Sequence, residues 1–125
     1  MSGNSILADT NILIYLLQGN EEIANYLNGK DIYISFISEL ELLSFPGLDD
    51  NDIENLRSFL GSVKIIDINA SIKSAAINLR SNYKFKLPDS IVAATASFLN
   101  LPLVTADKQL LKAQTEVNVQ LYDIK

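Results

Sequence analysis

The sequence lacks cysteine and histidine entirely, and these two absences exclude several kinds of active site. Without cysteine there can be no disulfide framework and no thiolate nucleophile. Without histidine there can be no Ser-His-Asp or Cys-His catalytic system, and the usual zinc ligands are missing. An enzyme of this composition must therefore work with carboxylates, Lys, Arg, Tyr, hydroxyl groups or a bound cofactor. If it binds a metal, its hard oxygen ligands favour Mg²⁺ or Mn²⁺.

Long hydrophobic runs are also missing, so nothing in the sequence approaches the length of a membrane span. The apolar run at residues 12–17 is short and has no basic region before it, which argues against a signal peptide. We therefore expect a soluble, cytoplasmic protein that does not enter a membrane. A length of 125 residues predicts a single domain, residues 1–125, with enough surface to bury a core.

Basic residues are fewer than acidic ones, 10 against 15, and the net charge is −5. Because nucleic-acid-binding proteins usually carry a basic surface, this balance argues mildly against tight, unaided binding of nucleic acid. It is compatible with an acidic pocket that holds a cation, or with a basic partner protein.

The most informative stretch of the chain is residues 6–17, in which a polar step separates two apolar segments. Residues 5–8 have the pattern of a short buried strand, and residues 12–17 that of a buried helix. Asp9, Thr10 and Asn11 lie between them. A strand that leads into a helix through a polar turn is typical of a β–α unit, whose ligand site lies beyond the carboxyl end of the strand.

The rest of the chain continues the alternation of strands and helices. Strands are expected at residues 5–8, 32–36, 63–68, 103–105 and, at an edge, 117–122; helices are expected at 11–18, 21–29, 38–43, 53–60, 69–83, 88–99 and 107–113. Such alternation predicts an α/β fold with a parallel sheet covered by helices on both faces.

Four acids occupy equivalent places in this pattern. Asp9 and Asp107 each end a buried strand, whereas Glu41 and Asp89 are expected in the first turn of a helix. Strand ends and the helix starts that follow them face the same edge of a parallel sheet, so all four carboxylates can converge there. Each acid also has a simpler explanation, since Asp9 and Asp107 can cap helices, Asp89 can complement the helix dipole, and Glu41 can complete a capping box. The capping-box partner would be Ser38, and Glu39 competes with Glu41 for the site.

Convergence of four carboxylates is unfavourable without a counter-ion. Two unit charges about 4 Å apart repel by about 1 kcal/mol in water and by about 4 kcal/mol at an effective dielectric of 20. A Mg²⁺ or Mn²⁺ ion reverses this sign, and such ions can activate water and stabilise the charge of a phosphodiester under attack. The four acids therefore suggest phosphodiester hydrolysis without histidine.

Four segments, taken in order, resemble the motifs of the PIN-domain family of metal-dependent ribonucleases, and within it the VapC-type toxins of toxin–antitoxin pairs. The first motif is similar to residues 7–14, the second to 34–43, the third to 87–96 and the fourth to 103–107. In the second motif the acid lies six residues after the first Ser, a register that selects Glu41 over Glu39. The resemblance covers nearly the whole chain.

This resemblance implies a three-layer αβα sandwich with a parallel sheet of about five strands. It implies Mg²⁺ or Mn²⁺ bound by Asp9, Glu41, Asp89 and Asp107 as the catalytic and metal-binding acids. It also implies that Asn11 and Thr105 orient the acids or the substrate. Basic residues around such a site contact RNA in many relatives. The candidates here are Lys84, Lys86, Lys108 and Arg80.

The resemblance also implies partners, namely an RNA substrate and a cognate antitoxin that would block the acidic site. A homodimer could form through Tyr15, Leu16 and Leu17 or through the helix at residues 53–60, although packing in the core is the simpler explanation for these side chains. The leading hypothesis is a metal-dependent endoribonuclease that acts as a toxin. The alternatives are an RNA-processing nuclease without a toxin role, an interaction protein with a PIN fold, and a phosphatase acting on small phosphoesters.

Overall fold

The computed structural model describes residues 4–123, and in this part of the chain five parallel strands form one sheet in the order β3-β2-β1-β4-β5. The strands are β1 (Ser5–Ala8), β2 (Asp31–Ser35), β3 (Lys64–Ile66), β4 (Leu103–Thr105) and β5 (Val119–Leu121). The α-helices are α1 (Thr10–Leu17), α2 (Glu21–Leu27), α3 (Phe36–Leu43), α4 (Asp50–Leu60), α5 (Ala70–Tyr83) and α6 (Leu87–Leu99), and a 3-10 helix, η1 (Lys108–Ala113), precedes β5. The predicted α/β class, the parallel sheet and the edge position of the last strand are confirmed.

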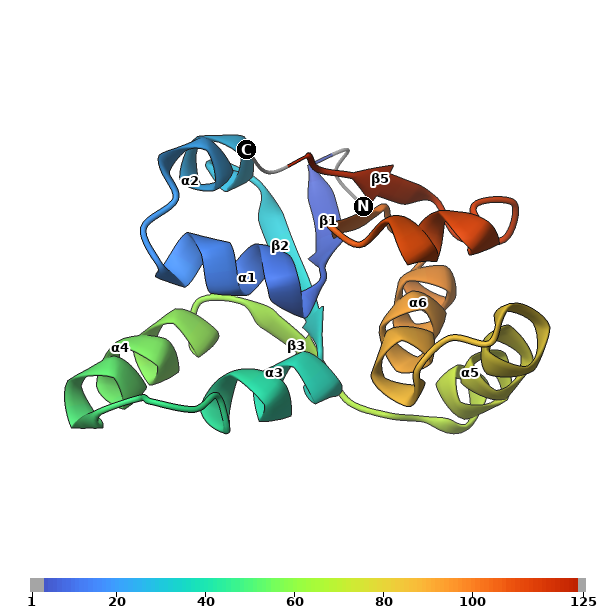
Figure 1. The fold of residues 1–125 in the computed structure, drawn as a ribbon, viewed down its shortest axis with the longest axis horizontal. Helices are drawn as coiled ribbons and strands as arrows, with labels where there is room; N and C mark the ends of the chain where they lie inside the picture. The colour runs from blue at the N-terminus through green and yellow to red at the C-terminus, as the bar shows by residue number, and fades with distance from the viewer. Residues whose placement is uncertain (1–3, 124–125) are drawn as a thin grey trace.

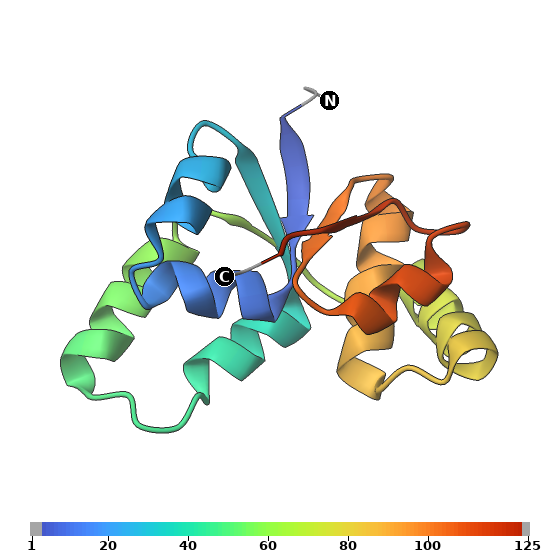
Figure 2. The ribbon, with the colours of Figure 1, turned by 45° about the horizontal axis from the view of Figure 1, so that its top comes forward.

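Side chains alternate between the two faces of the sheet and so divide the core into two layers. In β1, Ile6 and Ala8 join one hydrophobic cluster and Leu7 joins the other; in β4, Leu103 and Val104 divide in the same way. Helices α1, α2 and α4 cover the first face, and α5, α6 and η1 cover the second, as Figures 1 and 2 both show. The result is the predicted three-layer arrangement, because a parallel sheet is stable when both faces are covered.

Helix α3 connects the two layers at the carboxyl edge of the sheet. Its first residues, Phe36 and Ile37, pack against the core beneath α5 and α6, whereas Leu42 and Leu43 pack against the core beneath α1 and α4. Figure 1 shows the N-terminal ends of α1, α3 and α6 gathered below the end of β1. Segments far apart in the sequence therefore meet at this edge.

The start of α3 differs from the prediction, and the difference changes the role of Glu41. The helix begins at Phe36, with Ser35 as its N-cap, because the Ser35 hydroxyl accepts a hydrogen bond from the Ile37 N–H at 3.2 Å. Ser38 is consequently inside the helix, and the expected capping box between Ser38 and Glu41 is wrong. Glu41 lies in the second turn, not the first, so the simplest alternative explanation for this acid is removed.

Smaller differences occur at three other boundaries. Helix α1 begins at Thr10, one residue early, with Asp9 as its N-cap. Strand β3 ends at Ile66, before the predicted residue 68, because the Asp67 carboxylate accepts a hydrogen bond from the Ile68 N–H and turns the chain. The short helix near residue 107 is of the 3-10 type and begins at Lys108, after Asp107 as its cap. No helix within residues 4–123 is both long and apolar enough to cross a membrane.

The candidate dimer faces have different degrees of exposure. Tyr15 and Leu17 on α1 are exposed, at 36% and 42%, so core packing does not explain them. On α4, Leu56 and Leu60 are buried in the core, as the simpler explanation held.

Candidate functional site

Asp9 ends β1 and is held in place by hydrogen bonds to both of its carboxylate oxygens. Its side chain is buried, with 5% of its surface exposed. Oδ1 accepts a hydrogen bond from the Thr10 N–H at 2.8 Å, and Oδ2 accepts one from the Thr105 hydroxyl at 2.7 Å. Asp9 therefore does cap α1, but its second oxygen is fixed by a residue from another strand, which a simple cap does not require.

Burial raises the pKa of Asp9 from 3.8 to about 6. Burial has this effect because removal from water disfavours the charged form. The hydrogen bonds from Thr105 and Thr10 lower the pKa, whereas the negative charges of Asp89 and Glu41 raise it further. Two of the other predicted acids are therefore close enough for their charges to act on Asp9.

Asp89 lies in the first turn of α6, as predicted, and is half-buried. Its pKa is raised, first by burial and then by the charges of Asp107 and Glu41, while the nearby Lys86 ammonium lowers it. Asp89 thus experiences the fields of Asp107 and Glu41, and Asp9 those of Asp89 and Glu41. The fold brings the four carboxylates, which are far apart in sequence, into one electrostatically coupled group.

Glu41 is attached to the N-terminus of α1 through hydroxyl groups. The Thr10 Oγ1 lies 2.7 Å from Glu41 Oε1 and 2.9 Å from Ser38 Oγ. These contacts aim Glu41, and not Glu39, at the position of Asp9, which agrees with the register of the second motif.

Thr105 and Asn11 join the last strand of the site to α1. The Thr105 hydroxyl donates to Asp9 and accepts a hydrogen bond from the Asp107 N–H at 3.0 Å. The Asn11 Oδ1 accepts one from the Ala106 N–H at 3.2 Å. Asp107 also caps η1 by accepting from the Gln109 N–H. Thr105 thus contacts the Asp9 carboxylate and the Asp107 backbone, whereas Asn11 contacts the backbone between them, at Ala106.

The donor atoms suit a hard divalent cation, although the four carboxylates do not yet converge on one point. Within residues 4–123 no group of three or more acidic side chains is arranged to hold a metal ion. Oxygen-only ligands are those that Mg²⁺ and Mn²⁺ prefer. Burial is the main cause of the raised pKa values of Asp9 and Asp89, and the neighbouring carboxylates raise them further; a bound cation would offset both effects. The residues therefore fit a divalent cation, with side-chain rotation needed for them to share it.

The predicted RNA-contacting lysines, Lys84, Lys86 and Lys108, are all exposed, as is Arg80. Lys86 immediately precedes α6 and acts on Asp89, and Lys108 follows Asp107 directly. Lys84 ends α5 in the left-handed conformation, with φ of 58°. Lys108 is therefore next to a predicted acid in the chain, and Lys86 lies three residues before another.

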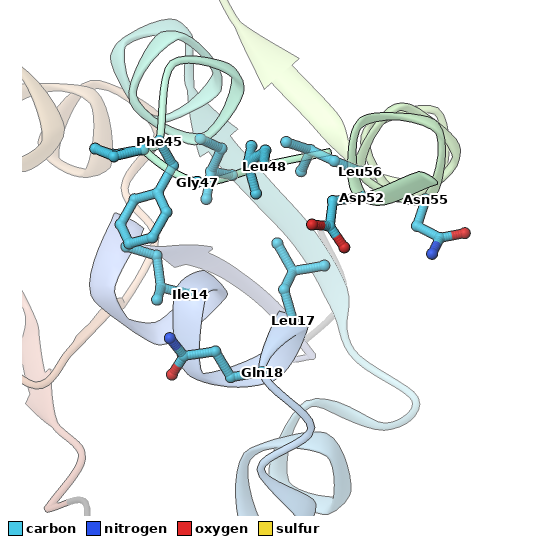
Figure 3. Close-up of a pocket in the computed structure, with 11 residues that line it drawn as sticks. Ile14, Leu17, Gln18, Phe45, Gly47, Leu48, Asp52, Asn55 and Leu56 are labelled. Carbon is cyan, nitrogen blue, oxygen red and sulfur yellow. The ribbon is translucent and has the colours of Figure 1, made fainter. Parts of the chain in front are cut away.

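A mostly apolar cavity of about 320 Å³ lies outside this group of acids. Figure 3 shows it between α1, the end of α3 and α4, with Leu17, Phe45 and Leu48 among its lining residues and Asp52 at its rim. None of the four predicted acids lines it.

The sequence pattern of the PIN domain matches residues 6–116. The chain belongs to the PIN domain family. This membership confirms the predicted family and supports a nuclease function, as a hydrolase of nucleic acids. Divalent metal ions are the general cofactors of PIN-domain nucleases. No curated protein sequence gives a significant match.

Solved structures with the same fold include toxin–antitoxin proteins. A toxin–antitoxin complex from Klebsiella pneumoniae contains a chain that is 32% identical, with a TM-score of 0.84 over 95% of this PIN domain and 99% of that chain. A chain of VapBC2 from Rickettsia felis, bound to a DNA fragment from its promoter, is 23% identical, with a TM-score of 0.82, and the match covers 95% of this chain and 99% of that chain. A chain of VapBC-1 from nontypeable Haemophilus influenzae is 22% identical, with a TM-score of 0.76, and the match covers 94% of this chain and 97% of that chain. The latter two similarities concern the fold alone.

Sequence reasoning did not identify Thr10 and Ser38 as part of this PIN-domain site. Their contact joins residues 28 positions apart, on α1 and α3. The available signal was the pattern of hydroxyl residues beside the acids, with Thr10 next to Asp9 and Ser38 three residues before Glu41.

Proposed function

We propose that this protein is a metal-dependent endoribonuclease that hydrolyses RNA phosphodiester bonds and acts as the toxin of a toxin–antitoxin pair. The observation that carries the proposal is the electrostatic coupling of Asp9, Glu41, Asp89 and Asp107 at one edge of the sheet. A nuclease of this composition has no histidine to use as an acid or base, so a carboxylate group that binds Mg²⁺ or Mn²⁺ is the chemistry open to it.

The four acids would hold the cation, and each is placed by a different part of the fold. The bound cation would stabilise negative charge on the phosphate and lower the pKa of water. Asp9 is the fixed ligand, since both of its oxygens are held by hydrogen bonds. Asp89 and Asp107 border the exposed Lys86 and Lys108, whose ammonium groups would contact the RNA phosphates on either side of the cleaved bond.

The toxin role and the antitoxin partner are supported by the 32% identical chain from a toxin–antitoxin complex, which this chain matches over nearly its full length. The acidic net charge is consistent with a basic partner protein. Leu17 and Phe45, which are exposed and line the cavity in Figure 3, offer apolar contact surface to such a partner, and Tyr15 is a further exposed apolar side chain on α1.

The decisive test is cleavage of a mixed RNA pool by the purified protein with Mn²⁺, with Mg²⁺ and with EDTA. Asp89→Asn should abolish cleavage, because it removes one charged ligand, while circular dichroism shows that the fold is intact. Asp67→Asn is the matched control, since Asp67 follows a strand but is exposed and engages only the backbone of Ile68. Full activity in a folded Asp89→Asn protein would refute the mechanism.

The same samples separate the alternatives. An interaction protein without metal chemistry would show no heat of Mn²⁺ binding in calorimetry and no cleavage in any condition. A phosphatase would hydrolyse a small phosphomonoester such as p-nitrophenyl phosphate and leave the RNA intact. A nuclease without a toxin role would cleave RNA in vitro but would not arrest growth when it is expressed alone.

A further inference from the structure

Thr10 makes hydrogen bonds to two of the proposed acids with two different donors. Its backbone N–H donates to Asp9 Oδ1 at 2.8 Å, and its side-chain oxygen lies 2.7 Å from Glu41 Oε1. Asp9 ends β1 and Glu41 belongs to α3, so one residue at the start of α1 connects carboxylates from two separate elements. Thr10 therefore links these two acids directly, through its backbone N–H on one side and its hydroxyl on the other.

The direction of the hydrogen bonds follows from the number of protons. A hydroxyl group has one proton to donate, and an ionised carboxylate can only accept. The Thr10 hydroxyl must therefore donate to Glu41, and the contact of 2.9 Å between Thr10 Oγ1 and Ser38 Oγ must use the Ser38 proton. The three side chains form a relay in which Ser38 donates to Thr10 and Thr10 donates to Glu41.

Burial makes this relay sensitive to the loss of any member. Ser38 is fully buried, and Thr10 is 9% exposed. A buried polar group that loses its partner keeps its desolvation cost, so each hydroxyl has a strong preference for the observed geometry. Between residues 4 and 123 every buried side-chain nitrogen and oxygen has a hydrogen-bond partner. Loss of one hydroxyl of the relay would therefore leave a buried polar atom without its present partner.

The relay opposes a repulsion between the acids. Glu41 and Asp9 carry like charges that act on each other, and Glu41 also acts on Asp89. Glu41 is only partly buried, and its side chain has three torsions through which it can turn toward water. Without the Thr10 hydroxyl, both solvation and repulsion would move the Glu41 carboxylate away from the other acids.

We propose that Thr10, supported by Ser38, is a positioning residue that holds Glu41 beside Asp9 and thereby sets the affinity of the site for its divalent cation. This inference rests on the proposed function, and it adds two residues to the chemistry of the site. Neither residue is a ligand, because the Thr10 hydroxyl acts on the cation only through Glu41.

Calorimetry with Mn²⁺ tests the proposal directly. Thr10→Val keeps the branched shape and the backbone N–H to Asp9 but removes the hydroxyl. We expect it to weaken Mn²⁺ binding about 10- to 100-fold, as is usual when the hydrogen-bond partner of a metal ligand is lost. Thr10→Ser should restore most of the affinity, and Ser38→Ala should cause a smaller loss than Thr10→Val.

Thr95→Val is the matched control. Thr95 is also buried, and its hydroxyl donates to the Ile91 carbonyl at 2.7 Å within α6. Thr95→Val makes the same substitution at a position whose hydroxyl contacts no acid, so the Mn²⁺ affinity of this variant should stay within about twofold of that of the wild type. In RNA cleavage, Thr10→Val should need more Mn²⁺ to reach half-maximal activity and should leave KM for RNA unchanged.

A double-mutant cycle of Thr10→Val and Glu41→Gln, measured by urea unfolding without metal, tests the hydrogen bond independently. Non-additive shifts in the unfolding midpoint are expected, because the two side chains interact. Additive shifts, or Mn²⁺ affinity unchanged in folded Thr10→Val while the wild type binds Mn²⁺, would overturn the proposal. If the wild type itself binds no Mn²⁺, the proposed function fails and the positioning role fails with it. This result can be told apart from the two outcomes above, in which the wild type does bind Mn²⁺ or the unfolding shifts are additive.

Discussion

Replacing Asp9 by Asn should stabilise the protein while it destroys the proposed site. Asp9 ionises with a pKa of about 6 in the folded state, against 3.8 for the unperturbed group. One pKa unit corresponds to about 1.36 kcal/mol, so the buried charge costs about 3 kcal/mol of stability at neutral pH. Asn is neutral and similar in shape, and it caps helices as well as Asp does. The variant should therefore gain about 2–3 kcal/mol in the free energy of unfolding at pH 7.5.

The gain should depend on pH in a defined direction. Well below pH 4, Asp9 is protonated in both the folded and the unfolded state, and the variant has no advantage. Between about pH 4 and 6 the unfolded chain releases the proton that the folded chain still holds, so wild-type stability falls as pH rises. The difference between the two proteins should open over this interval and become constant above about pH 7.

Urea unfolding of both proteins, followed by circular dichroism between pH 4 and 8, measures this difference. Asp49→Asn is the control, because Asp49 is also a helix N-cap, of α4, but is exposed. We expect it to change stability little, because it removes no buried charge. A folded Asp9→Asn protein that is less stable than the wild type at pH 7.5 would refute the reasoning, since it would mean that the hydrogen bonds from Thr10 and Thr105 outweigh the cost of burying the charge.

Four other outcomes can be measured on the same protein. Saturating Mn²⁺ should raise the free energy of unfolding of the wild type, by about 2.7 kcal/mol at 100 times its Kd, and EDTA should reverse the effect. In the same urea assay, Mn²⁺ should leave the free energy of unfolding of Asp9→Asn almost unchanged. Asp89→Asn should also stabilise the fold in metal-free buffer at neutral pH, since the pKa of Asp89 is raised, and the gain should shrink as the pH is lowered and the carboxyl becomes protonated. Lys84→Gly should stabilise by about 0.5–1 kcal/mol, because Gly adopts the left-handed conformation without strain, yet it should weaken RNA binding in a gel-shift assay. Leu7→Ala should cost about 2–5 kcal/mol in thermal unfolding, because Leu7 is fully buried in the sheet.

The sheet and most helices follow from local pattern, because each strand and helix in this chain agrees with its own sequence. The helix predicted from residue 69 begins there because the Asn69 side chain caps α5, accepting a hydrogen bond from the Ile72 N–H at 2.8 Å. The helix predicted to end at residue 99 does end there, and Asn100 follows it in the left-handed conformation. These features depend on residues a few positions apart, which is the range over which sequence patterns carry information.

The error at Ser38 shows where local pattern fails. Ser38 and Glu41 have the spacing of a capping box, but Ser35, at the end of β2, is earlier in the chain and caps the helix first. Once the helix has begun at Phe36, the same Ser–Glu spacing places both side chains on one face of it. That face meets Thr10 on α1, and the pattern that suggested a cap is in fact the support for Glu41. Only the packing of α1 on α3 separates these two explanations.

The buried and exposed apolar residues were harder to separate from sequence. Tyr15 and Leu17 belong to the same apolar run as Ile12 and Leu13, yet the first two are exposed and the last two are fully buried. The sequence run is apolar on all sides, so its period does not mark the covered face. Which side chains face water is decided by the neighbouring helices α2 and α3, which lie elsewhere in the sequence.

The composition of the site explains why its acids are held by neutral donors. A carboxylate near other carboxylates needs hydrogen bonds to stay in place, and Lys or Arg would supply the strongest ones. A cationic side chain inside the group would also neutralise the negative charge that attracts a divalent ion. Thr10, Ser38 and Thr105, together with the backbone N–H groups, fix the acids without adding charge. Substitution of Thr10 by Lys should therefore satisfy Glu41 and still abolish Mn²⁺ binding, whereas Thr10→Ser should preserve both.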